Sequence, residues 1–599
     1  MGTRRGRRGS GPVSEYPEIQ TIGPFVKGWT MAWLKTDGLV CELGNDRIAL
    51  RFSADGKATS VVVDGRELLV NLSGADADPD RDHSFYCDYH VGGKTRNLHP
   101  TRLEVIADTT ELVHVAYVDD ESQLKLAYHL VIAGEDPAVY GYVVAGTDEP
   151  GVVINELRTV YRFDSSLLTT GYTGARQGLQ PRAQYMAKEG EWLQDETYRL
   201  ADGMRYSNSD VYSKYDYAGY FAENDVWGQW SGGRTDDEWG AWFIPLDKSC
   251  YPTGPLKQEL LVHYDCIILN YMTGAHFGTG DFEVPQGWEK LYGPWCFYFN
   301  HGADPVADAQ ARAATERTAL PAPWLDEPSL YSGEYASLSG ELELAAPLDH
   351  PRGWTVVATD APGDYFDQKA GRIYYASTEG ADDVDRFELA GMQPGRYWLR
   401  ARLNATTDAE EYDLGEFELA AGQALDAGTL TARNSVRPLV WNLGLSTGTT
   451  EGFKFSDQPR NYVWMGLTPK NLTYRVGEDD DWYYLQRNDG VWKIEFPRPE
   501  QASGRYLLTI CLAGTTASSM TSGGLDVDFH VALNGEEVAS ETYGTDRAAY
   551  RSSVTGGKPE AVRVALDAAS LRDANEVAFT TNGMVMYDMV KLEALGDGE

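Results

Sequence analysis

Three observations predict that this chain folds as an all-β protein. Apolar and polar residues alternate with period two in runs such as 47–65, 124–145 and 259–272, and these runs are rich in β-branched and aromatic residues. Aromatic residues make up 12% of the chain, with 36 Tyr and 16 Trp, and such side chains favour pleated sheets. Asp-Gly pairs at 55–56 and 64–65 mark tight hairpins between strand-like runs. Together they favour β-sandwiches.

The chain is too long for a single core, because 599 residues exceed what one domain usually buries. Composition changes along the sequence predict four parts. These are a leader or disordered tag at 1–22, a large β-sandwich at 23–325, a small fibronectin-III-like sandwich at 326–433, and a jelly roll of the type found in carbohydrate-binding domains at 434–599.

Local patterns support these divisions. The proline-rich stretch 321–328 closes the first sandwich, just after an alanine-rich run at 305–320 that predicts a helix. The turn at 393–397, Gln-Pro-Gly-Arg-Tyr, joins two strand-like runs in the way expected of a small sandwich.

Charge and cysteine content exclude several classes of function. The formal net charge is −38, so non-specific binding to nucleic acid is not expected. No apolar run is long enough to span a membrane, and the basic start of the chain lacks the apolar core of an intact signal peptide. The six cysteines form no Cys-x-x-Cys pair, and Cys266 and Cys296 are expected to be buried thiols.

Two stretches hold candidate catalytic residues. The run 269–282, LNYMTGAHFGTGDF, places His276 after Tyr271 and a turn of small residues, and histidine is scarce, with 10 in the chain. The run 211–220, VYSKYDYAGY, places Lys214 among tyrosines. A histidine and a lysine in an aromatic setting suit proton transfer on a sugar.

The motifs NYMTGAH, SKYDYAGY, ELRTVYRF and LYGPWCFYFN resemble those of rhamnogalacturonan lyases of polysaccharide lyase family four, and the later domains match in the same order. The resemblance implies a galactose-mutarotase-like β-sandwich, then a fibronectin-like domain and a jelly roll. It implies endolytic β-elimination at rhamnose-α-1,4-galacturonate bonds of type I rhamnogalacturonan. It also implies that Lys214 and His276 are the catalytic pair, with Arg158, Tyr271 and Tyr215 binding substrate.

The chemistry of β-elimination fits these residue types. The reaction removes the C5 proton of a uronate and expels the oxygen at C4, so it needs a base, an acid and a cation near the carboxylate. Lys214 can be the base only if its ammonium loses a proton, and His276 can then protonate the leaving oxygen. Exchanging the two roles also satisfies the chemistry, so both assignments stay open.

Each of these residues also has a simpler, structural interpretation. His276 could be a structural hydrogen bonder, and Lys214 could reach into solvent. Arg158 is as reasonable an ion-pair partner as a carboxylate binder. Tyr271 could belong to the core, and Trp295 is expected to pack there.

No cofactor is expected for catalysis, since Lys and Arg can neutralise the uronate. The acidic runs Asp76–Asp82 and Gly477–Trp482 are candidates for structural calcium, although a solvated loop is the simpler interpretation. Trp441, Trp482 and Trp492 could line a sugar face, with core packing as the alternative.

Three other functions compete with this hypothesis. The first is a lyase of the same fold on another rhamnose- and uronate-containing polymer. The second is a glycoside hydrolase, which needs two carboxylates roughly 5–9 Å apart, such as Asp216 and Asp281. The third is a non-catalytic carbohydrate-binding protein. We expect a monomer whose partner is the polysaccharide; the resemblance implies an extracellular protein, while the missing export signal leaves action on imported oligosaccharides inside the cell as the alternative.

Overall fold

The structure is a computed structural model that describes residues 31–596 except 71–81, 175, 195, 202–209, 275, 319, 321, 326, 349–351, 381–383, 457–467, 489, 501–503, 518–525, 550 and 552–555. The predicted all-β class is confirmed: the described residues form many sheets and two α-helices, α1 (Ala183–Glu189) and α2 (Pro305–Glu316). Helix α2 matches the helix expected at 305–320. In the described part of the chain, neither helix has the length and apolar character needed to cross a membrane.

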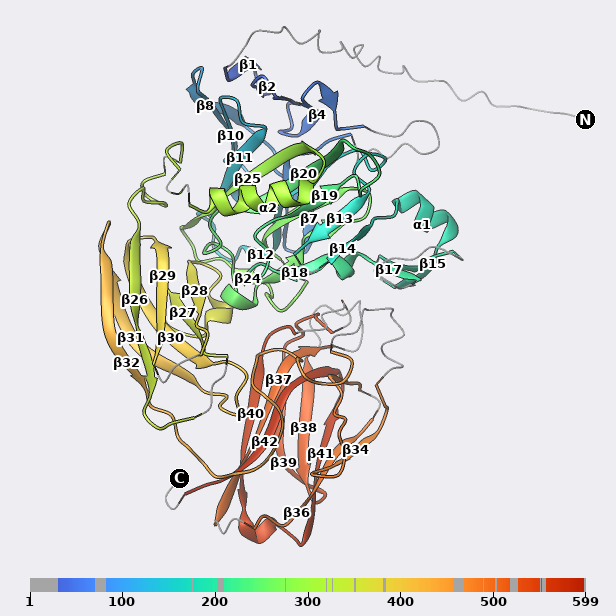
Figure 1. The fold of residues 1–599 in the computed structure, drawn as a ribbon, viewed down its shortest axis with the longest axis vertical. Helices are drawn as coiled ribbons and strands as arrows, with labels where there is room; N and C mark the ends of the chain where they lie inside the picture. The colour runs from blue at the N-terminus through green and yellow to red at the C-terminus, as the bar shows by residue number, and fades with distance from the viewer. Residues whose placement is uncertain are drawn as a thin grey trace, which may run out of the picture.

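The first region is built around a nine-stranded antiparallel sheet. Its central strands are buried at nearly every position, and Phe297 of this sheet packs ring against ring with Tyr161 and Phe85. Helix α2 packs against β25 and β20 of this sheet, as Figure 1 shows. In spatial order the strands are β14 Arg176–Leu179, β13 Thr170–Thr173, β19 Trp227–Trp230, β20 Glu238–Pro245, β25 Trp288–Gly302, β11 Ala138–Thr147, β10 Lys125–Ala133, β9 Leu112–Asp119 and β8 Arg102–Asp108.

A second, six-stranded sheet carries two of the candidate site residues, Arg158 and Tyr271, and His276 follows one of its strands. Its central strand β12 pairs antiparallel with β6 on one side and with β23 on the other. Its strands are β22 Val262–His263, β23 Ile267–Thr273, β12 Val153–Arg162, β6 Tyr86–Val91 and β7 Lys94–Asn97, with β24 Phe282–Glu283 also paired to β12.

Smaller sheets complete this region. A meander of five strands precedes it, and the Asp-Gly turns at 55–56 and 64–65 make its hairpins as predicted, with Asp64 and Gly65 both at positive φ. The strands of the meander are β1 Trp33–Asp37, β2 Val40–Gly44, β3 Ile48–Phe52, β4 Ala58–Val63 and β5 Arg66–Glu67. A three-stranded sheet holds β15 Glu191–Gln194, β16 Thr197–Arg199 and β17 Val211–Ser213. A two-stranded sheet pairs β18 Ala218–Tyr220 with β21 Gln258–Leu260.

The middle region is a sandwich of a three-stranded and a four-stranded sheet. Trp354 and Phe387 lie in the core between them. The first sheet holds β29 Asp385–Met392, β26 Ala336–Leu344 and β32 Ala424–Ala432, and the second β28 Ile373–Ser377, β27 Trp354–Thr359, β30 Gly395–Leu403 and β31 Glu411–Leu419.

The C-terminal region is a sandwich of two five-stranded sheets. Trp441, Trp482 and Trp492 are 6%, 3% and 0% exposed, so all three pack in its core. Its strands are β33 Leu439–Gly444, β42 Met584–Ala594, β37 Arg505–Thr516, β40 Glu560–Asp567 and β35 Leu485–Gln486; then β34 Leu472–Arg475, β36 Trp492–Pro497, β41 Ala574–Thr581, β38 Val527–Leu533 and β39 Glu536–Tyr543.

The C-terminal region docks on the face that carries the candidate site (Figure 1). Tyr215 and Phe277 join the same buried apolar cluster as Ala548 of the C-terminal region. The backbone N–H of Gly278 donates to the carbonyl of Asp546 at 3.0 Å. These contacts place the loop after β23 against the C-terminal sandwich.

All six cysteines are buried and unpaired, which confirms the expectation for Cys266 and Cys296. Trp295 is 1% exposed on β25 and packs in the core, as predicted. The leader predicted at 1–22 lies outside the described residues.

Candidate functional site

His276 lies just beyond the end of β23, in the loop that meets the C-terminal region. Its ring stands edge-on to Tyr271, with ring centres 5.3 Å apart, and 5.9 Å from the ring of Tyr215. The side chain is 10% exposed. Burial and the charge of Arg551 lower the pKa of His276, the carboxylate of Glu259 opposes them, and the net direction is downward.

Glu259 on β21 holds the other side of this imidazole. Its Oε1 lies 2.7 Å from Nδ1 of His276, and its side chain has no exposed surface. The pair is close but not aligned as a full hydrogen bond in the described structure, as is common for catalytic contacts before substrate binds. Lys257 is also buried, and its Nζ lies 4.0 Å from Glu259 Oε2.

Lys214 begins the short 3₁₀ helix η3 (Lys214–Tyr217). Ser213 caps this helix through a reciprocal box with Asp216, which fixes where the lysine side chain starts. Because Thr197 pairs with Ser213 across β16 and β17, the next residue outward, Glu196, comes to lie beside Lys214. Nζ of Lys214 forms an ion pair with Glu196 Oε2.

Glu196 is held by more than the lysine. His263 Nε2 lies 3.5 Å from its Oε2, and the Tyr264 hydroxyl donates to its Oε1 at 2.7 Å. Burial raises the pKa of Glu196, but His263 and Lys214 outweigh burial and hold it well below its usual range. Glu196 also adopts a φ of +45°, an uncommon angle for a non-glycine residue, and such strain clusters at functional sites.

Arg158 on β12 is already occupied by protein groups. Its Nε and Nη2 donate to the two oxygens of Asp88 at 2.7 and 2.9 Å, and its Nη1 lies 3.1 Å from Glu156 Oε1. Nη1 also donates to the Tyr271 hydroxyl at 2.7 Å. This geometry supports the ion-pair interpretation of Arg158 more than the carboxylate-binding one.

The five residues predicted from sequence lie in one continuous chain of contacts. It runs from Arg158 through Tyr271 and His276 to Tyr215, whose ring lies 5.1 Å below Nζ of Lys214. The structure therefore brings together residues separated by more than one hundred positions.

Five further residues complete the site and were not predicted: Lys257, Glu259, Glu196, His263 and Arg551. Arg551 comes from the C-terminal region, and its guanidinium lies 5.8 Å from the ring centre of Tyr215. A signal for two of them does exist in the sequence: Lys257 and Glu259 interrupt the apolar run 256–263, and charged residues are rarely buried without a reason.

The carboxylates proposed for a hydrolase have other roles. Asp216 is buried and accepts the backbone N–H of Ser213 as part of the η3 cap. Asp281 is exposed at the surface. Because Asp216 takes part in this cap and Asp281 lies in solvent, the two carboxylates lack support as a hydrolase pair.

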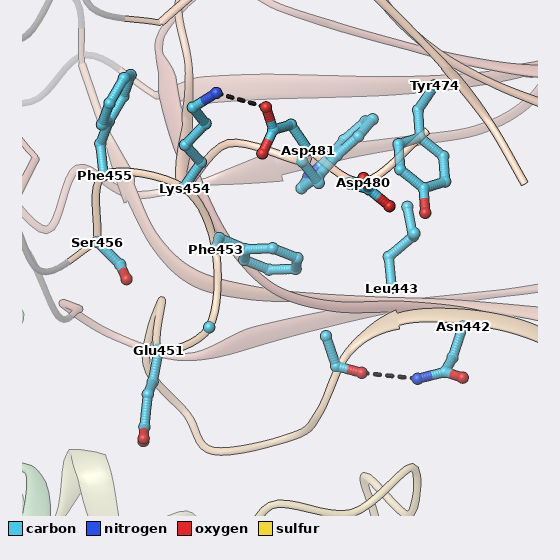
Figure 2. Close-up of a pocket in the computed structure, with 13 residues that line it drawn as sticks. Asn442, Leu443, Glu451, Phe453, Lys454, Phe455, Ser456, Tyr474, Asp480 and Asp481 are labelled. Carbon is cyan, nitrogen blue, oxygen red and sulfur yellow. Dashed lines mark hydrogen bonds and ion pairs between the residues drawn. The ribbon is translucent and has the colours of Figure 1, made fainter. Parts of the chain in front are cut away.

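The acidic run 477–482 borders a separate cavity of about 660 Å³ in the C-terminal region, shown in Figure 2. Asp481 pairs there with Lys454, and Asp479 accepts the backbone N–H of Arg475. Nowhere in the described ranges do three or more His, Cys, Asp or Glu side chains gather as a metal site. Residues 76–81 of the other acidic run lie outside the described part of the chain.

Two known proteins and one family profile are similar to this chain. A rhamnogalacturonate lyase of Dickeya dadantii (strain 3937) is 38% identical over 573 residues, which cover 93% of this chain and 94% of the relative. A probable rhamnogalacturonate lyase B of Aspergillus flavus is 24% identical over 521 residues, or 78% of this chain and 76% of the relative. The sequence profile described as "CBM-like: Polysaccharide lyase family 4, domain III" matches residues 439–592.

Proposed function

The chain belongs to polysaccharide lyase family 4, the family of the rhamnogalacturonate lyases, and we propose that it cleaves rhamnose-α-1,4-galacturonate bonds of type I rhamnogalacturonan by β-elimination. The observation that carries the proposal is the contact chain between Lys214 and His276: Nζ of Lys214 lies 5.1 Å, and the imidazole centre of His276 5.9 Å, from the ring centre of Tyr215. A β-elimination needs two such groups, one to accept a proton and one to donate.

The reaction balances with these groups alone. One side chain takes the proton from C5 of the galacturonate as the C4–O bond breaks. The electron pair of the C5–H bond becomes the new C4–C5 double bond, and the departing oxygen takes a proton from the other side chain. No water is consumed, and exchanging the roles of Lys214 and His276 leaves the balance unchanged.

The charges around the site favour a uronate substrate. The whole chain carries a net charge of −38, which opposes an anionic polymer at long range. Nζ of Lys214 and the guanidinium of Arg551 lie 5.1 and 5.8 Å from the ring centre of Tyr215, so a uronate carboxylate meets local cations there. Neutralising that carboxylate is what makes the C5 proton removable.

The residues of this site remain our proposal. Lys214 and His276 are assigned as the catalytic pair, and Tyr215, Tyr271 and Arg158 as the groups that shape the subsite. Arg158 does so by fixing Tyr271 through its hydroxyl. Endolytic action, a monomeric state and an extracellular location also remain predictions.

The test is ultraviolet absorbance during incubation with purified type I rhamnogalacturonan, followed by sizing of the products. A rising signal from the conjugated double bond is expected, together with an early fall in polymer length if cleavage is endolytic. New reducing ends without absorbance would mean hydrolysis and would overturn the proposal. Absorbance only with a different uronate polymer would correct the substrate and keep the chemistry.

A further inference from the structure

Glu259 stands behind His276 in a place that solvent does not reach. Its Oε1 is 2.7 Å from Nδ1 of the imidazole, and its side chain is 0% exposed. A charge interaction at this distance is much stronger in a water-excluded site than at the surface. The contact also leaves Nε2, the other ring nitrogen, away from Glu259.

Lys257 supplies the balancing charge for Glu259. Its side chain is 1% exposed, and its Nζ lies 4.0 Å from Glu259 Oε2. Within the described residues neither of these two atoms has a hydrogen-bond partner. A buried ion pair that is not fully hydrogen-bonded is a poor way to stabilise a fold, because desolvation offsets the attraction. A role in the site explains its presence better.

Gly274 makes the contact sterically possible. A Cβ built at Gly274 would lie 1.9 Å from Glu259 Oε2, far inside van der Waals contact. The φ angle of Gly274 is not in the left-handed region, so the backbone does not need a glycine here. The glycine two positions before His276 is therefore required by the carboxylate.

We propose that Glu259 is the positioning residue of His276: it fixes the ring through Nδ1 and presents Nε2 to the substrate, while Lys257 keeps Glu259 ionised. The proposal rests on the function proposed above, and it adds a role for three residues outside the expected pair. In this arrangement the Nδ1 proton stays in place through the reaction, and Nε2 alone exchanges a proton with the sugar.

The surrounding charges agree with this arrangement. Burial raises the pKa of Glu259, but His276 and Lys257 outweigh it, so the net direction is downward and the carboxylate is ionised. Burial lowers the pKa of Lys257, with Glu259 opposing. The groups that face His276 are Glu259, Arg551, Glu156 and the rings of Tyr215 and Tyr271.

The experiment compares Glu259→Gln with wild type in the full chain. Removing the carboxylate is expected to lower kcat about 10- to 100-fold, the usual range for losing an orienting partner, with KM changed less than about threefold. Because Glu259 raises the pKa of His276, its loss moves the limb of the pH–rate profile that reports His276 to lower pH. Nuclear magnetic resonance titration of carbon-labelled histidine rings, with His276→Ala to identify the signal, must show the same downward shift.

Three further variants distinguish displacement of the Glu259 carboxylate from a general loss of stability. Gly274→Ala displaces the carboxylate without removing it and should reproduce the kcat loss, whereas Gly134→Ala, with nothing closer than 4.0 Å to its Cβ, should not. Glu316→Gln removes a buried carboxylate on α2 that bonds the Tyr140 hydroxyl, so it should lower stability without moving the His276 titration.

Each outcome decides the proposal. An unchanged His276 titration in Glu259→Gln, with only a lower melting temperature, would overturn it, as would wild-type kcat in Gly274→Ala. If wild-type protein cleaves no rhamnogalacturonan, the proposed function fails on its own. The ring titration would still show in that case whether Glu259 controls His276.

Discussion

The two proposed catalytic side chains each lie against a carboxylate, but the two carboxylates differ in their access to solvent. Glu196, beside Lys214, has a side chain that is 35% exposed, whereas Glu259, beside His276, is 0% exposed. Glu196 sits on a hairpin at a strained backbone angle, while Glu259 lies within a paired strand next to a buried lysine. We therefore expect a substrate carboxylate to replace Glu196 as the partner of Lys214, and Glu259 to stay in place beside His276.

This difference follows from where each contact is built. The Lys214 contact joins the ends of β16 and β17, at the rim of the site. The His276 contact is enclosed by β21, the loop after β23 and the C-terminal region. We expect the rim contact to open when substrate binds, because the Glu196 side chain is 35% exposed and can stay bound to His263 and Tyr264 when Lys214 leaves it. The enclosed contact cannot open in this way, so it suits orientation of a ring that works in every cycle.

The largest effect is expected from removing either of the two proposed catalytic side chains. Lys214→Ala and His276→Ala should each lower kcat about 10²- to 10⁴-fold, the range for losing a general acid or base. The rate of unsaturated-product formation at saturating substrate measures this loss. Exposed matched controls are Lys125→Ala and His301→Ala, which should keep wild-type rates. Full activity in Lys214→Ala would show that Lys214 is not catalytic. Its contact with Glu196 would then have no role in the reaction.

Arg158 also contacts a carboxylate, that of Asp88. Substituting Arg158 tests whether this contact is as permanent as the contact between His276 and Glu259. Arg158→Lys cannot keep the two-pronged contact to Asp88, so the free energy of unfolding should fall by about 2–4 kcal/mol. Denaturant unfolding measures this, and KM should change less than about threefold. A large rise in KM with unchanged stability would instead make Arg158 a direct ligand of the uronate.

The sequence predicted the strands, helix α2 and the Asp-Gly hairpins, because these depend on local periodicity and turn chemistry. It also predicted the five residues of the contact chain, but through the resemblance of their motifs to a known family. Tyr271 and Tyr215 lie in the motifs of His276 and Lys214, whereas Arg158 lies in the separate motif ELRTVYRF. Their carboxylate partners could not be assigned in the same way. Glu196 reaches Lys214 through the register of β16 and β17, and Glu259 reaches His276 across separate strands, and neither pairing is written in a local pattern.

The sequence also could not predict which tryptophan side chains are buried. Trp482 and Trp492 lie in strand-like runs that suit a sugar platform or a core equally well, and the two-sheet packing of the C-terminal region places both inside. The role of Gly274 was also hidden, since a glycine before His276 suggests a turn, while the structure shows that it makes room for Glu259.

A smaller effect is expected from removing the charge of Glu196, the proposed exchangeable partner of Lys214. Glu196→Gln removes the charge that competes with a substrate carboxylate for Lys214, so KM should fall about two- to fivefold, in line with a partly exposed ion pair. The change in kcat should stay below that of Glu259→Gln. Steady-state kinetics on one defined oligosaccharide measure both, and the KM difference should shrink at high salt. A loss of kcat larger than that of Glu259→Gln would reverse the assignment of exchangeable and permanent partners.

The smallest effect concerns stability against pH. The pKa of Glu196 is lower in the folded protein than in the unfolded chain, so its stabilising contribution is present above the ordinary value of about 4.5 and is lost as the pH falls below it. The melting temperature of wild type should therefore exceed that of Glu196→Gln at about pH 7, and the gap should close as the pH drops below about 4.5. Asp148→Asn, which removes the exposed partner of Lys125, should show little gap at either pH. His276 also has a lowered pKa, so its contribution is lost as the pH falls below about 6.5 in both proteins and cancels from the comparison. A gap that stays constant down to the lowest pH would mean that the ionised carboxylate of Glu196 adds nothing to folding, and that its ion pair with Lys214 serves the site alone.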